Sequence, residues 1–148
     1  MSKLIYISAI NNIKFDLDIT ARVTFITGDS GTGKTYLVSV IKKALLNKVA
    51  TKYCSINMNR FVIIEDDLTI SNLVNLKDMS VVLVDRYDCF SIESKKKLWN
   101  KMKTANAAWI IMTRYLDFPQ YAFKDMYSIE ELEYKRDKNS LVLSFSKK

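Results

Sequence analysis

The fold is decided by the stretch Val23-Thr-Phe-Ile-Thr-Gly28-Asp-Ser-Gly31-Thr-Gly33-Lys34-Thr35, which Tyr36-Leu-Val-Ser-Val-Ile41 follows. Five strand-forming residues lead into a glycine-rich turn, and the residues after the turn are typical of a helix with an apolar face. The whole chain contains 3 glycines, and all of them lie in this turn. Because the chain is otherwise free of glycine, their grouping indicates a turn with a special backbone geometry.

The spacing of this turn, from Gly28 to Thr35, matches the G-x-x-x-x-G-K-[ST] pattern of a phosphate-binding loop. Glycines allow successive backbone N–H groups to point inward around an anion, and the positive N-terminal end of the next helix adds to the same site. We expect Lys34 to reach the β- and γ-phosphates and the Thr35 hydroxyl to ligate Mg²⁺. The predicted nucleotide-binding residues of the loop are Gly28, Asp29, Ser30, Gly31, Thr32, Gly33, Lys34 and Thr35.

Length and composition are typical of one globular domain. The chain has 148 residues, of which 49% are hydrophobic and 26% charged, and we expect a single domain over 1–148. No apolar run approaches the about 18 residues of a membrane span, and the Met1-Ser-Lys-Leu4 start lacks a signal-peptide core, so a cytoplasmic location is expected. The net charge of +7 favours polyanionic partners without choosing among them.

Strands and helices alternate along most of the chain. The expected elements are a hairpin over 4–19, a strand over 23–27, a helix over 34–48, strands over 51–56 and 60–65, a helical segment over 69–78, a strand over 80–85, a helix that Ser91 caps and that ends near Thr104, a strand over 107–113 and a second hairpin over 126–145. This order predicts a three-layer α/β domain with a mostly parallel sheet, to which antiparallel hairpins are added at both termini.

Two apolar strands end in carboxylates that could hold Mg²⁺ beside the loop. Val81-Val-Leu-Val84 leads into Asp85, and Phe61-Val-Ile-Ile64 leads into Glu65-Asp66-Asp67. We favour Asp85, because its strand is purely aliphatic and adjoins a second core strand in the sequence. Asp66 remains the alternative, and a solvated turn is the simplest role for its acidic run.

The order of these motifs resembles the P-loop NTPases of the ATPase branch, which include AAA-type, RecA-like and ABC/SMC-type proteins. The resemblance spans roughly 23–114 and rests on the loop, the strand ending in Asp85, the helix after it and the strand ending in Thr113-Arg114. It implies a P-loop NTPase fold, binding of Mg²⁺-ATP, and Thr113 or Arg114 as the γ-phosphate sensor. The leading hairpin resembles in particular the antiparallel strands of ABC/SMC-type nucleotide domains.

One position departs from this resemblance, and it weakens the inference that a protein which binds ATP also hydrolyses it. Active members commonly carry Glu directly after the strand-ending Asp, to orient the attacking water, and this chain has Arg86 there. Asp88 or Glu65 could take that role. The predicted catalytic residues are Lys34, Asp88 and Arg114.

The expected activity is therefore that of a slow or partner-dependent ATPase. Adenine is favoured over guanine because the chain lacks a guanine-specific N-K-x-D motif, and the glycine-rich signature of ABC transporters is also missing. Two alternatives remain: a small-molecule or nucleotide kinase, and an ATP-binding regulatory module with little or no hydrolysis.

Basic residues on the expected helix 92–104 are a candidate surface for nucleic acid, with Tyr121, Phe123 and Tyr127 as nearby aromatics. The residues are Lys95, Lys96, Lys97, Lys101 and Lys103. A solvated helix face is the simpler interpretation of such a run. Arg60 and Arg114 could act across a subunit boundary in a homo-oligomer or toward a partner protein, although a surface salt bridge is their simpler role.

Overall fold

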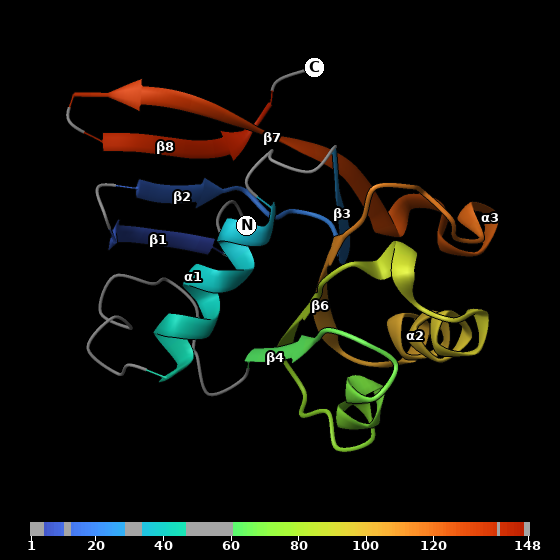
Figure 1. Cartoon of the computed structure of the whole chain (residues 1–148). Helices are drawn as coiled ribbons and strands as arrows, with labels where there is room; N and C mark the ends of the chain where they lie inside the picture. The colour runs from blue at the N-terminus through green and yellow to red at the C-terminus, as the bar shows by residue number, and fades with distance from the viewer. Residues whose placement is uncertain (1–4, 11–12, 29–33, 47–60, 139, 147–148) are drawn as a thin grey trace. The chain divides into compact units, whose positions relative to one another are not determined.

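The structure, a computed structural model, describes residues 5–10, 13–28, 34–46, 61–138 and 140–146 (Figure 1). The chain forms two compact units: residues 1–20, 28–59 and 130–148 belong to the first, and residues 21–27 and 60–129 to the second. The strands form a mixed, mostly parallel arrangement with few helices, which confirms the predicted α/β class. The prediction of a single domain over 1–148 stays a prediction.

Both predicted hairpins are present in the first unit. β1 (Ile5–Ile10) pairs antiparallel with β2 (Ile13–Leu17), and β7 (Tyr127–Asp137), which begins in the second unit, pairs antiparallel with β8 (Ser140–Phe145). The two hairpins join through a parallel pairing of β2 with β8 that the sequence did not predict. The resulting strand order is β1-β2-β8-β7.

The core of the first unit follows the sequence pattern closely. Phe15 and Leu17 of β2 are fully buried, whereas Asp18 is exposed. Helix α1 (Lys34–Leu46) buries its apolar face, including Leu37 and Ile41, and the Phe15 ring stacks on Tyr36 with centroids 5.9 Å apart. The strand expected over 51–56 lies outside the described residues.

The second unit contains four strands whose pairings with one another are all parallel. Its strands, in the order β3-β6-β5-β4, are β3 (Val23–Thr27), β6 (Ala107–Met112), β5 (Ser80–Val84) and β4 (Phe61–Ile64). Every residue of β5 is buried, as expected for a parallel strand that is covered on both faces. The register places Ile26 opposite Met112, and Val84 opposite both Ile111 and Ile64. All four strands therefore end at one edge of the sheet.

Helix α2 (Ile92–Thr104) begins and ends where the sequence predicts. The Ser91 hydroxyl caps it by accepting from the Ser94 N–H at 3.2 Å, and Asp67 accepts from the Ser91 N–H at 3.1 Å. Hydrogen bonds from Ser94 and then from Ser91 hold the pKa of Asp67 below its ordinary value. Leu98 and Met102 are fully buried in the core that α2 shares with the sheet.

The segment expected to be helical over 69–78 forms only the short 3-10 helix η3 (Thr69–Leu73), and turns follow it. Its polar residues favour this difference, because Ser and Asn side chains can hydrogen-bond to nearby backbone and so compete with a continuous helix. The Ser71 hydroxyl does so by donating to the Leu68 carbonyl at 3.3 Å. The other short helices are η4 (Tyr87–Cys89), α3 (Gln120–Phe123) and η5 (Lys124–Met126). Over the described residues, none of the helices has the length and apolar character needed to cross a membrane.

Candidate functional site

The glycine-rich loop starts with the backbone geometry that its first glycine predicts. Gly28 has φ 127°, a region that a side chain with a Cβ atom does not enter without strain. The loop residues Asp29, Ser30, Gly31, Thr32 and Gly33 lie outside the described residues. At the start of the loop, the structure therefore agrees with a turn that requires glycine.

Lys34 and Thr35 are the first two residues of α1, which has 13 residues. The Lys34 Nζ donates a hydrogen bond to the Gly28 carbonyl oxygen, so the lysine side chain folds back toward Gly28. Thr35 is exposed in the first helical turn. The helix thus begins with an ammonium group, a hydroxyl and the positive end of its own dipole, and each of these can interact with an anion.

Asp85 lies directly after β5, at the carboxyl edge of the parallel sheet. Its N–H donates to the Ile64 carbonyl at 2.8 Å, and the Thr113 N–H donates to the Ile26 carbonyl at 3.1 Å. These bonds continue the ladders past the strand ends, so Asp85 and Thr113 share the edge from which the chain leaves β3. Asp85 is half-buried.

The acidic run that competes with Asp85 stabilises local turns. The Asp66 carboxylate accepts from the Thr69 N–H at 2.9 Å, while the Asp66 N–H donates to the Thr69 hydroxyl at 3.1 Å. Asp67 caps α2 through Ser91. Both carboxylates are exposed, which agrees with the role of a solvated turn.

The structure brings together three of the predicted site residues: Asp88, Thr113 and Arg114. The Asp88 carboxylate accepts from the Arg114 N–H at 3.1 Å and lies 3.4 Å from the Thr113 hydroxyl. Asp88 belongs to η4, after β5, and the other two residues follow β6. A carboxylate is therefore fixed at the end of β6, beside the strand that ends in Asp85.

Arg86 explains how Asp88 reaches this position. Its φ of 53° and ψ of 45° are left-handed, a conformation that costs a residue with a side chain on the order of 1 kcal/mol. The chain reverses there, and the Cys89 N–H closes the η4 turn on the Arg86 carbonyl at 2.9 Å. The exposed Arg86 side chain stands where the resemblance places Glu, and the turn that follows it presents Asp88.

Thr113 and Arg114 differ in how accessible they are to a phosphate. Thr113 is 1% exposed, and its hydroxyl donates to the Tyr115 carbonyl at 2.6 Å. Arg114 is exposed, and its guanidinium carbon lies 6.0 Å from the centroid of the Tyr115 ring. Arg114 is therefore the better placed of the two to reach a ligand, while Arg60 lies outside the described residues.

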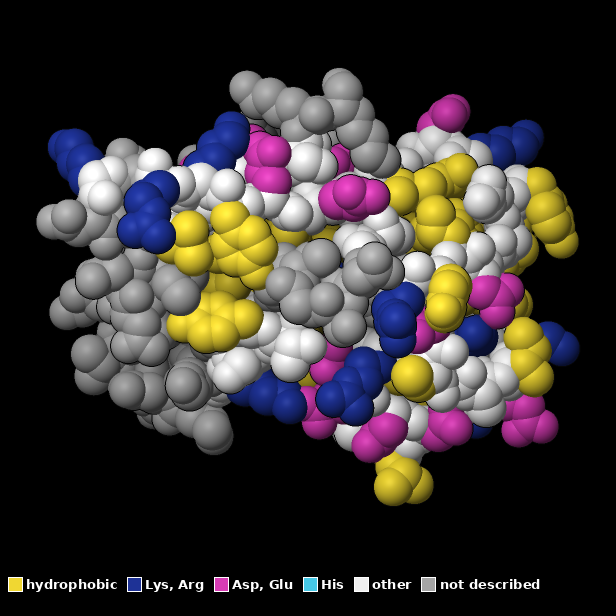
Figure 2. All heavy atoms as spheres, turned by 45° about the horizontal axis from the view of Figure 1, so that its top comes forward, with side chains coloured by type: hydrophobic (Ala, Val, Ile, Leu, Met, Phe, Trp, Pro, Cys, Tyr) yellow, Lys and Arg dark blue, Asp and Glu magenta, His cyan; other side chains and the backbone are white. Residues whose placement is uncertain are grey.

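The lysine run on α2 does not form one continuous basic strip. Lys95 is 7% exposed, with its Nζ 3.0 Å from the Asp117 carboxylate and 5.2 Å from the centroid of the Tyr87 ring. Phe123 is also buried and cannot stack on a base from solvent. On the face seen in Figure 2, basic and acidic side chains are interspersed. The prediction that Lys95 offers its charge to nucleic acid is therefore wrong, because its helix face packs on the core.

Tyr87 is the centre of a hydrogen-bond network that no sequence motif indicates. Its hydroxyl accepts from the Trp99 Nε1–H at 2.7 Å and donates to the Asp117 carbonyl. Burial raises the pKa of Tyr87 above its ordinary range. The network joins η4, α2 and the segment after β6, so it holds the turn that carries Asp88.

We expect Tyr87→Phe to lower the free energy of unfolding by about 1 kcal/mol, because it takes the hydroxyl away from the partly buried bonds to the Trp99 Nε1–H and the Asp117 carbonyl. Urea unfolding followed by circular dichroism measures this change. Tyr121→Phe is the matched control, since Tyr121 is 82% exposed. Equal stability of the two variants would show that the network does not hold the turn.

Comparisons with known proteins do not assign the chain to a family. No family model matches the sequence, and no curated protein matches it. The function is therefore argued from the site alone.

Proposed function

We propose that the protein binds Mg²⁺-ATP through a P-loop site and hydrolyses it slowly or in response to a partner. We also propose that the fold is that of a three-layer P-loop NTPase domain. The observation that carries it is the position of the loop motif directly after β3, in a parallel sheet whose neighbouring strands end in Asp85 and Thr113 at the same edge. Ligands of open α/β sheets bind outside the carboxyl ends of the strands.

The residues at the start and end of the loop fit a nucleotide triphosphate. Gly28 has a φ that admits no larger residue without strain, and Lys34 already has its ammonium group against the Gly28 carbonyl. We propose that Lys34 exchanges this bond for the β- and γ-phosphates, and that Thr35 and Asp85 hold Mg²⁺. The metal ion, when bound, neutralises charge on the β- and γ-oxygens.

Asp88 supports hydrolysis in place of the missing Glu. We propose that its carboxylate orients the attacking water, since the Arg114 N–H donates to it at 3.1 Å and holds it at the end of β6. The Arg114 side chain is exposed, so it is accessible to a ligand. The left-handed Arg86 supports this assignment, because strained residues in sheet-edge turns often serve to position functional groups.

A second candidate is an ATP-binding regulatory module with little turnover. The observation that favours it is that both oxygens of Asp88 have protein contacts. Oδ1 accepts from the Arg114 N–H at 3.1 Å and Oδ2 lies 3.9 Å from the Cys89 Sγ, which leaves less of the carboxylate available for a water molecule. Such a module would exchange ATP for ADP without using Asp88.

A turnover assay with the purified full chain separates these candidates. We expect Mg²⁺-dependent release of phosphate from ATP in preference to GTP, and we expect Asp88→Asn to slow it about tenfold, the equivalent of one hydrogen bond of about 1.4 kcal/mol to the water. The affinity for ATP should stay unchanged in this variant. Glu93→Gln is the matched control, because Glu93 is an exposed acid in the first turn of α2.

Other results of the assay would indicate the regulatory module or the kinase. ATP binding with no phosphate release, with or without added DNA, indicates the regulatory module. Transfer of the phosphoryl group to a small acceptor in a panel of nucleosides, nucleotides and sugars indicates the kinase. Absence of ATP binding in the folded wild-type protein overturns the proposal as a whole.

A further inference from the structure

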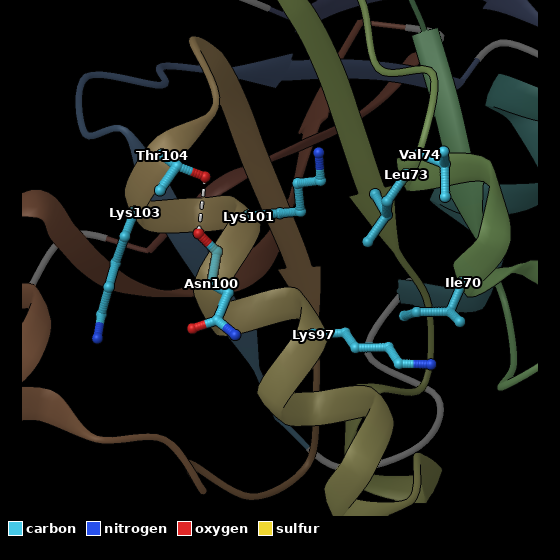
Figure 3. A pocket seen from close by; sticks show the side chains of 8 residues that line it. All are labelled: Ile70, Leu73, Val74, Lys97, Asn100, Lys101, Lys103 and Thr104. Atoms are coloured by element: carbon cyan, nitrogen blue, oxygen red, sulfur yellow. Dashed lines mark hydrogen bonds between the residues drawn. The ribbon is translucent and has the colours of Figure 1, made fainter.

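An apolar groove lies between η3 and α2, on the second unit and outside the proposed nucleotide site. Its cavity has a volume of about 430 Å³. One wall consists of aliphatic side chains from η3 and the residue after it, Ile70, Leu73 and Val74. The other wall is α2, whose Lys97 and Lys101 side chains extend across the groove toward the aliphatic wall (Figure 3).

Two aliphatic residues that flank η3 in the sequence are open to solvent. Val74 is 73% exposed, and Leu68, immediately before η3, is 86% exposed. Exposed apolar residues that adjoin a groove are typical of a surface that another molecule covers. A small ligand confined to the cavity would leave Leu68 in water, so the exposure of these two residues favours a longer occupant.

The charges of the groove are all of one sign. Lys97 and Lys101 are four residues apart on one helix face, where like charges repel, and neither forms a salt bridge with any residue in the described part of the chain. Lys103 points away from the groove, with its Nζ 5.6 Å from the centroid of the Phe123 ring. Carboxylates from another molecule would relieve the repulsion between Lys97 and Lys101.

We propose that this groove binds an acidic amphipathic segment of a partner protein. Its apolar side chains pack on Ile70, Leu73 and Val74, and its carboxylates pair with Lys97 and Lys101, in the manner of a helix laid in a groove. A second copy of this chain is a poor occupant, because each copy carries a net charge of +7. Nucleic acid is also disfavoured, since the groove residues include no aromatic side chain on which a base could stack.

Selection from a random library of 16-residue peptides displayed on phage, against the immobilised full chain, tests the proposal. We expect the selected peptides to combine Asp and Glu with apolar residues at helical spacing. The best of them, labelled with fluorescein, is then titrated by anisotropy. We expect Lys97→Glu with Lys101→Glu to weaken binding about tenfold, as two lost ion pairs would, and Val74→Glu to weaken it by a similar factor.

Lys96→Glu with Lys124→Glu is the matched control, because it makes the same change in charge at exposed lysines that do not line the groove. We expect its affinity to stay within twofold of wild type. The proposal is overturned if both double variants lose the same amount of peptide affinity, or if the selected peptides contain no acidic residues. The proposal is also overturned if no peptide binds and a 20-nucleotide poly-dT strand or dodecanoate binds in a way that the groove variants weaken.

This test is independent of the nucleotide site. The groove variants should retain the ATP affinity of the wild-type protein, since none of the changed residues belongs to the proposed nucleotide site. Loss of peptide binding with intact ATP binding therefore reports on the groove alone.

Discussion

Replacing Lys34 with alanine should weaken ATP binding by about 100-fold, because the lysine makes charge-assisted bonds to two phosphates that together contribute about 3 kcal/mol. The folded chain already holds this ammonium group at the loop, against the Gly28 carbonyl. Isothermal titration with a non-hydrolysable ATP analogue measures the loss. The effect should fall on affinity and not on folding, since the helix starts at this residue and alanine is a good helix former.

Lys42→Ala is the control for this variant. Lys42 is an exposed lysine of the same helix, two turns further along, so its loss removes the same charge away from the loop. We expect its ATP affinity to equal that of the wild-type protein. Unchanged affinity in a folded Lys34→Ala protein contradicts the central claim that the loop binds phosphate.

The sequence predicted those parts of the fold that depend on neighbouring residues. Alternation of apolar and polar residues identified both hairpins, and the all-aliphatic run before Asp85 identified a strand buried on both faces. The parallel pairing of β2 with β8 was not predictable in the same way. It joins opposite ends of the chain, and no local pattern specifies which strand edges meet.

The prediction that Lys95 belongs to an exposed basic surface is wrong for a different reason. Within a run of three lysines it resembles part of a solvated face, yet it stands three and seven residues before Leu98 and Met102, which are fully buried. Helical periodicity therefore places Lys95 on the core side of α2. Only the fold supplies the Asp117 carboxylate and the Tyr87 ring that make this burial possible.

The candidate site was predictable in its composition but not in its local geometry. Parallel strands end at one edge, so the sequence could associate Asp85 with Thr113 and Arg114. The contact of Asp88 with Arg114 depends on the left-handed Arg86, and arginine gives no sequence signal for that conformation.

Asp85→Asn should weaken the Mg²⁺ dependence of ATP binding while nucleotide binding persists. A carboxylate that holds the metal ion through water is an outer-sphere partner, and the loss of such a partner costs about 10- to 100-fold in metal affinity. We expect the Mg²⁺ concentration for half-maximal ATP binding to rise by this factor. Titration of Mg²⁺ at fixed ATP, with a fluorescent ATP analogue, measures the shift.

Asp66→Asn tests whether the carboxylate that holds the metal ion follows β4 or β5. Asp66 is exposed and already accepts a hydrogen bond from the Thr69 N–H at 2.9 Å, so its loss should disturb the turn before η3 and leave the Mg²⁺ titration unchanged. Both variants keep the shape of the side chain and remove one charge, so a difference between them isolates the metal contact. If the Mg²⁺ concentration for half-maximal ATP binding rises in Asp66→Asn and not in Asp85→Asn, the carboxylate that holds the metal ion is the one after β4.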